Sequence, residues 1–298
     1  MAATDTPSAR RPALWADLAV LGVAVVWGAS YPVAKGALAH APVLLLIFYR
    51  FLATALVMAA IARRDLAVAP RRDWLAGAVL GGILFAIFLA ETWGVAMTTA
   101  TNTALIISLC TVFTPFLDYG QKRRLPPVGV IVGAAIAVVG VGVLAGGVGS
   151  LGAGDLLVLG AAGLRAVMVV STKRLMEGRA LSSAALTAVQ AATVAGLTLV
   201  ALLAWTGPGG FFVSAGAEFW GAVAFLSLFC TIGAFYVQNA AVRRTSPTRV
   251  SFLMGTEPLF GFALAWAILS EAATPATLIG AGLIVGGTFM GLAAEHRR

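Results

Sequence analysis

The sequence has few of the residues that catalysis and metal binding use. Only 11% of its 298 residues are charged, and it contains two histidines and two cysteines. His40 and His296 lie outside the apolar stretches, while Cys110 and Cys230 lie in two separate apolar stretches, so these side chains form no metal-ligand pattern. We therefore expect no metal and no cofactor, and the cysteines do not indicate a redox compartment.

The sequence motifs of catalysis are missing as well. The chain has no H-E-x-x-H and no G-x-S-x-G, and its carboxylates are spread over different depths without suggesting a dyad. It also lacks the G-x-x-x-x-G-K-[ST] loop that holds nucleotide phosphates, so ATP does not drive it from within this chain. We expect no catalytic residue and predict that the protein is not an enzyme.

Apolar residues dominate the chain instead. They make up 60% of the sequence, and the mean hydropathy is +0.96. One window after another exceeds 18 apolar residues, the length that spans a bilayer. A soluble domain cannot bury that much apolar surface, so the composition predicts an integral membrane protein.

Ten apolar spans are separated by short connections that are rich in charge, proline or glycine. These connections leave no room for a soluble domain, so we predict an all-α integral membrane bundle of ten transmembrane helices. The predicted spans are 15–36, 42–62, 73–97, 101–120, 127–146, 154–176, 181–204, 217–242, 247–269 and 276–294.

Lysine and arginine fall on one side of this predicted topology. Of the 20 basic residues, 17 lie at the two ends and in alternate connections, whereas the opposite connections have none. This bias predicts a multi-pass protein of the cell inner membrane with both termini in the cytoplasm. Because topology explains the net charge of +8, we expect no nucleic-acid partner. The 17 residues are Arg10, Arg11, Arg63, Arg64, Arg71, Arg72, Lys122, Arg123, Arg124, Lys173, Arg174, Arg179, Arg243, Arg244, Arg249, Arg297 and Arg298.

The chain contains an internal duplication. The stretch "DLAVLG" at Asp17 recurs as "DLLVLG" at Asp155, and "VGAAIAVVG" at Val132 parallels "IGAGLIVGG" at Ile279. We divide the chain into a first half, 1–147, and a second half, 148–298, with five spans each. Because five is odd, the second half enters the membrane upside down, and such inverted repeats are typical of secondary transporters.

The stretches "WGASYPVAK" and "YRF" in the first half and "EPLFGFALAWAILSE" and "IGAGLIVGG" in the second resemble EamA-type members of the drug/metabolite transporter superfamily. Within this superfamily the chain is most similar to the YddG-type exporters of aromatic amino acids. The resemblance implies ten helices, a central cavity between the two EamA-like repeats, and export of small metabolites. The chain departs from a symmetric pattern where Arg124 stands at the position that matches Glu271, which puts in doubt any role for a pair of glutamates.

Several polar residues lie deep in the predicted spans. At ~1.5 Å per residue, Arg165 and Glu257 are each ~15 Å from a membrane face, and Arg50 is ~12 Å from one. A charge at such depth costs at least about 2.5–3.5 kcal/mol and therefore faces a partner or water. Arg165 and Glu257 either form a structural salt bridge or bind the carboxylate and ammonium of a zwitterionic substrate. Arg50 either binds substrate or packs against a helix carbonyl end.

Aromatic residues near these charges are further candidates for substrate binding. Trp27 lies ~15 Å deep, and Tyr31 shares its helix face one turn away. Trp93 and Tyr236 lie in spans with other polar residues. We predict that the cargo is a hydrophobic, most of all aromatic, amino acid. Packing in the core or toward lipid remains open for Trp27, and an interfacial position remains open for Tyr31.

Gating or coupling is predicted for a second group, in which Lys35 and Glu91 both lie about 27 Å from the inner face. Lys35 either extends to the outer headgroups or pairs with Glu91 as an outer gate. The prolines Pro32, Pro115 and Pro258 free backbone carbonyls and favour helix breaks around a site.

Other functions remain open at this point. A cationic drug or metabolite is a second candidate for the cargo, and a passive facilitator or channel is an alternative to a coupled carrier. Glycine pairs four residues apart, such as Gly129 and Gly133, favour close helix packing. Besides lipid and the small-molecule substrate, we expect a monomer or a weak homodimer.

Overall fold

The computed structural model of the protein describes residues 7–121, 123–144, 151–179, 181–211, 215–234, 237 and 254–296. The regular elements in these ranges are all helical, which confirms the all-α class. The first half contains α1 (Pro7–Ala37), α2 (Val43–Ile61), α3 (Arg63–Val68), α4 (Arg71–Met97), α5 (Ala100–Ile107), α6 (Cys110–Gln121) and α7 (Val128–Leu144). The second half contains α8 (Ala153–Met176), α9 (Ser183–Thr206), η2 (Pro208–Phe211), α10 (Ala217–Phe225), η3 (Leu226–Gly233), α13 (Glu257–Leu269) and α14 (Pro275–His296).

Seven helical stretches are long and apolar enough to cross a membrane. Three shorter apolar helices, Val128–Leu144, Ala217–Gly233 and Glu257–Leu269, lie in the ranges predicted for the other spans. Parts of the predicted spans 217–242 and 247–269 fall outside the described residues. The helices confirm a multi-pass integral membrane protein.

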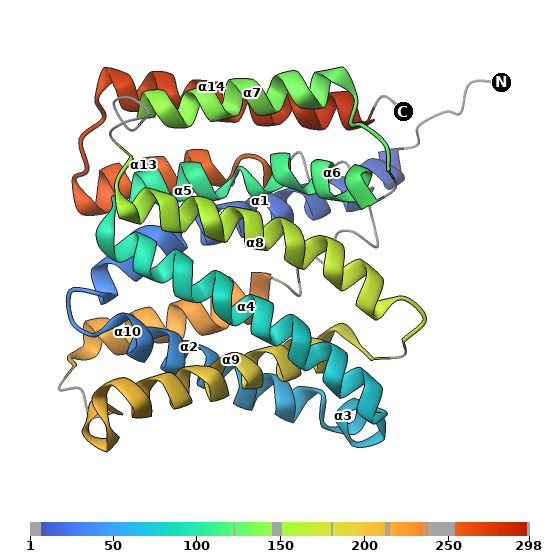
Figure 1. The fold of residues 1–298 in the computed structure, drawn as a ribbon, viewed down its shortest axis with the longest axis vertical. Coiled ribbons are helices and arrows are strands. Elements are labelled where there is room, and N and C mark those ends of the chain that lie inside the picture. The colour runs from blue at the N-terminus through green and yellow to red at the C-terminus, as the bar shows by residue number, and fades with distance from the viewer. Residues whose placement is uncertain are drawn as a thin grey trace.

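Helices of the two halves alternate across the bundle. Figure 1 shows α7 beside α14 along one edge and α2 beside α9 along the opposite edge, with α1, α4, α5, α8 and α13 between them. The end of α4 lies near the starts of α5, α8 and α14, and we call this the Thr98 end of the bundle. α1 begins and α14 ends at the opposite end, which we call the Arg71 end.

Glycines let α7 and α14 approach closely. A Cβ added at Gly133 would lie 2.5 Å from the carbonyl oxygen of Gly287, and one at Gly140 would lie 2.8 Å from the backbone nitrogen of Ile284. Any side chain at these two positions must push the helices apart. The predicted close packing therefore joins the two halves within one chain, and the oligomeric state stays a prediction.

The fourth predicted span is divided at Ser108 and Leu109, between α5 and α6. Pro115 lies inside α6, where it cannot donate to the Thr111 carbonyl. Two hydroxyls nearby bond to other carbonyls of this region, since Thr111 Oγ1 donates to the Ser108 carbonyl and Thr114 Oγ1 to that of Cys110. In the second half, α13 starts at Glu257 with Pro258 in its first turn. α1, by contrast, continues as a helix through Pro32.

Candidate functional site

An ion pair joins α4 to α8 in the interior of the bundle. Arg165 donates from Nη2 and Nε to Glu91 Oε2 at 2.7 and 3.2 Å. The Glu91 side chain is 9% exposed and the Arg165 side chain 29% exposed, so this two-point contact is shielded from solvent. Of the alternatives left open by the sequence, the salt bridge between Arg165 and Glu257 and the pairing of Glu91 with Lys35 are therefore not formed.

The error comes from the reference used for depth. Counting from Asp73 places Glu91 near the outer edge, whereas Thr98 Oγ1 donates to Asp155 Oδ1 at 2.6 Å and sets α4 and α8 level at their Thr98 ends. Glu91 precedes Thr98 by seven residues and Arg165 follows Asp155 by ten. Their backbones then differ in depth by about 5 Å, a distance that an arginine side chain spans.

Glu257 pairs with a tyrosine. Tyr31 Oη, on α1, donates to Glu257 Oε1, in the first turn of α13, at 2.6 Å. Tyr31 is 2% exposed, so it does not belong to an interfacial belt. Glu257 still lies close enough to Arg165 and Glu91 to interact with them electrostatically. Tyr31, Glu91, Arg165 and Glu257 thus form one central cluster contributed by α1, α4, α8 and α13.

Arg50 lies in α2 and contacts no carboxylate among the described residues. Its Nε and Nη2 donate to Thr231 Oγ1 at 3.4 and 3.2 Å, and its guanidinium lies 4.7 Å from the centre of the Phe88 ring. The predicted contact with a helix carbonyl end is not formed. Thr231 belongs to η3, a π-helical segment, and such segments are frequent at functional sites.

The second terminal nitrogen of Arg50, Nη1, makes no hydrogen bond to a described residue. Among the fully buried side-chain nitrogen and oxygen atoms of the described residues, only Thr288 Oγ1 lacks a partner. Nη1 is therefore not fully buried. Arg50 thus has both an uncompensated charge and a free donor.

Trp27 lies on the seam between α1 and η3. Its indole Nε1 donates to the Cys230 carbonyl at 2.7 Å, and Cys230 Sγ donates back to the Val26 carbonyl at 3.4 Å. The ring is partly buried against a cluster that includes Leu226 and Cys230. Its position is that of a packed aromatic at the boundary between the halves.

One predicted aromatic residue, Trp93, is not brought to this cluster. Trp93 is 42% exposed and lies two residues from Glu91, which turns it about half a helical turn away. Tyr236 lies outside the described residues.

Lys35 caps a helix. Its Nζ donates to the carbonyls of Val95, Ala96 and Thr98 at 2.8, 3.2 and 2.5 Å, which are the carbonyls that α4 leaves unpaired at its end. A cation there also interacts favourably with the negative end of the helix dipole. The ammonium therefore binds backbone within the protein and does not extend to headgroups.

Glu271 caps the next helix from the other half of the chain. Its Oε1 and Oε2 accept from the backbone nitrogens of Ala100 and Thr101 at 2.7 and 2.9 Å, at the positive start of α5. Lys35 and Glu271 thus hold the α4–α5 turn from opposite ends. Sequence reasoning noted Glu271 only as unmatched in the first half, because nothing in the sequence shows which helix end a loop carboxylate reaches.

Two aspartates that were not predicted as site residues bind the halves together at the two ends. At the Thr98 end, Asp155 Oδ1 accepts from Thr98 and, at 3.0 Å, from Asn102 Nδ2. At the Arg71 end, the buried Asp73 accepts from Arg179 Nη1 at 2.7 Å. Polar contacts therefore join the region of α4 to that of α8 at both ends of the bundle and in its interior.

Comparisons with known proteins match most of the chain to one family. The model of the EamA-like transporter family matches residues 14–146 and again residues 152–292. A solved crystal structure has a similar fold, with a TM-score of 0.67 and 20% sequence identity over 95% of this chain and 98% of that one. At this identity the likeness shows the fold alone. No curated protein matches the sequence.

Proposed function

The chain belongs to the EamA-like transporter family, whose members are membrane transporters and not enzymes, and on this basis we propose that it exports amino acids, above all aromatic ones. The proposed path leads from the cytoplasm across the inner membrane. Ten helices in two inverted five-helix repeats, 1–147 and 148–298, would provide alternating access to a central site. The two separate family matches and the polar contacts that join the two halves support this arrangement.

The observation that carries the proposal is that two opposite charges of the bundle, Arg50 on α2 and Glu257 on α13, form no ion pair among the described residues. Glu91 and Arg165 neutralise each other, so Arg50 and Glu257 remain to interact with a ligand. An amino acid presents one carboxylate and one ammonium, which complement these two groups. The planar fork of an arginine suits a carboxylate well, and we assign this role to Arg50 in place of Arg165.

The preference for aromatic side chains rests on α1. Trp27 and Tyr31 lie one turn apart, and both make hydrogen bonds to the second half of the chain. Tyr31 is buried and holds Glu257, whereas the Trp27 ring is only partly buried. A substrate ring that packs on Trp27 would gain about 0.5–1.5 kcal/mol beyond its buried area. The resemblance to YddG-type exporters supports the same cargo. A lipophilic cation is the second candidate, because it would gain from Glu257 but be repelled by Arg50.

Replacing Arg50 by glutamine should reduce uptake of labelled phenylalanine into proteoliposomes by about 10- to 100-fold. The reason is the loss of charge-assisted hydrogen bonds to the substrate carboxylate, worth roughly 1.5–3 kcal/mol. Uptake of 2-phenylethylamine, which is phenylalanine without the carboxylate, should not fall. Arg63→Gln is the matched control, since Arg63 is an exposed arginine of the short helix α3.

Two results would overturn the proposed function. Wild-type protein that transports 2-phenylethylamine better than phenylalanine would identify a cation exporter. Uptake that is not accelerated by unlabelled substrate on the opposite side of the membrane would identify a channel or passive pore, since only a carrier shows counterflow.

The orientation is tested by cysteine labelling in intact cells, after Cys110 and Cys230 have been replaced by alanine. We expect single cysteines at Ala39, Gly209 and Ala273, all exposed at the Thr98 end, to react with an impermeant reagent. Gly149, in the same group of connections, lies outside the described residues. A cysteine at Ala67 in α3 should react only after permeabilisation. The reverse pattern would place both termini outside.

A further inference from the structure

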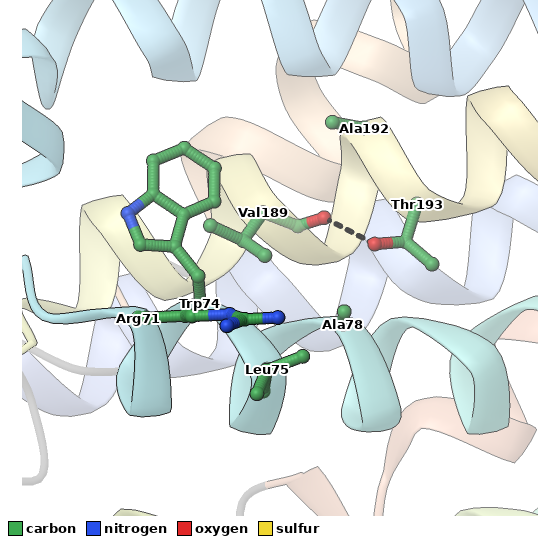
Figure 2. Close-up of a pocket in the computed structure, with 7 residues that line it drawn as sticks. All are labelled: Arg71, Trp74, Leu75, Ala78, Val189, Ala192 and Thr193. Atoms are coloured by element: carbon green, nitrogen blue, oxygen red, sulfur yellow. Dashed lines mark hydrogen bonds between the residues drawn. The ribbon is translucent and has the colours of Figure 1, made fainter.

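A groove opens between α4 and α9 near the Arg71 end of the bundle. It has a volume of about 360 Å³. Figure 2 shows Arg71, Trp74 and Ala78 on α4 opposite Val189 and Thr193 on α9. The groove joins a helix of the first half to a helix of the second, and it lies away from the central cluster.

The polar groups of the groove are gathered at its Arg71 end. Arg71 makes no ion pair or hydrogen bond with a described residue, whereas its neighbour Arg72 lies 3.7 Å from Asp73. The Trp74 indole is 41% exposed, and its N–H makes no hydrogen bond in the described part of the chain. This end of the groove therefore offers a free cation and a free donor.

The walls of the groove are apolar. Thr193 Oγ1 donates to the Val189 carbonyl at 2.8 Å, the bond drawn in Figure 2, so its hydroxyl is not left for a ligand. The two helices pack closely beside the groove, because a Cβ at Gly77 would lie 2.8 Å from Val189 Cγ1 and one at Gly81 would lie 2.6 Å from Thr193 Cβ. An occupant has to be apolar along the walls and anionic at the Arg71 end.

The position of the groove in the membrane selects the ligand. Arg71 is the first residue of α4, a 27-residue helix that crosses the bilayer, and Ala78 lies about 10 Å further along it. A cation and an indole at the interface, followed by an apolar channel into the hydrocarbon, match a headgroup followed by an acyl chain. We propose that this groove binds an anionic phospholipid, with its phosphate at Arg71 and one acyl chain along α4 and α9.

The test is thermal melting of the full-length protein in detergent micelles with added phosphatidylglycerol or phosphatidylcholine. Phosphatidylglycerol should raise the melting temperature more than phosphatidylcholine does. Arg71→Gln should weaken its apparent affinity by roughly fivefold, the effect of removing one cation from an anionic membrane surface. Arg71→Lys should retain most of the stabilisation, and Ala78→Phe, which fills the groove, should reduce it.

Arg64→Gln is the matched control, since Arg64 is an exposed arginine of α3 outside the groove, and it should leave the lipid effect unchanged. If Arg64→Gln and Arg71→Gln lose the same amount of stabilisation by phosphatidylglycerol, the lipid acts by general charge attraction, and the proposed site is wrong. Equal stabilisation by both lipids, or by inorganic phosphate alone, would also overturn it. So would a lipid effect that appears only when the protein dimerises.

Discussion

Replacing Glu91 by glutamine is expected to destabilise the protein by about 3 kcal/mol or more, because removing one partner of a buried ion pair leaves the other charge uncompensated. Arg165 is held at two points by this single carboxylate, and Glu257 already accepts the Tyr31 hydroxyl. The melting temperature in detergent should therefore fall steeply. The double variant Glu91→Gln/Arg165→Met should recover most of the loss, since neither charge then remains.

The control for this prediction is Glu177→Gln, which removes an exposed carboxylate at the end of α8 and should change stability by no more than about 0.5 kcal/mol. The double variant Glu257→Gln/Arg165→Met is compared with Glu91→Gln/Arg165→Met. If both recover stability to the same extent, Glu257 is the partner of Arg165 after all. If Glu91→Gln and Arg165→Met are each stable and active, the Glu91–Arg165 ion pair has no structural role.

Replacing Glu271 by glutamine is expected to open the Thr98 end of the bundle. Each charge-assisted hydrogen bond contributes about 1.5–3 kcal/mol, so losing the carboxylate charge on Ala100 and Thr101 should shift the population of the closed state by at least tenfold. Lys35→Met should act in the same direction from the α4 side of the turn. Transport should slow in both variants, because closure of this end is part of alternating access in the proposed function.

Cys110 provides a reporter for this opening. It begins α6 and lies close enough to Arg165 and Glu257 to interact with them electrostatically. With Cys230 replaced by alanine, an impermeant thiol reagent should label Cys110 faster in Glu271→Gln than in the parent protein. Glu218→Gln is the control, because Glu218 is 82% exposed and pairs with His40 at 3.0 Å, away from the α4–α5 turn. Unchanged labelling of Cys110 in Glu271→Gln would show that the contact of Glu271 with the α4–α5 turn does not control access of the reagent to the interior.

The membrane class, the all-helical character and the presence of two related halves could be read from the sequence because they depend on local composition and order along the chain. An apolar run of 18 or more residues has to become a helix in lipid, whatever it packs against. Counting along the chain also placed Glu257 deep in its span, and the structure shows it bonded to the buried Tyr31. Family membership follows from the same one-dimensional signals.

The partners of the charged residues required the tertiary structure. Counting misplaced Glu91 in depth, and it gives neither the rotation of a helix about its axis nor its tilt. All three decide whether Arg165 contacts Glu257 or Glu91. The capping roles of Lys35 and Glu271 depend on three elements far apart in the sequence, α1, the α4–α5 turn and the loop after α13. Because a hydrogen bond forms only within about 3 Å, side chains at equal depth on opposite helix faces cannot form one, and only the packed bundle determines which of them meet.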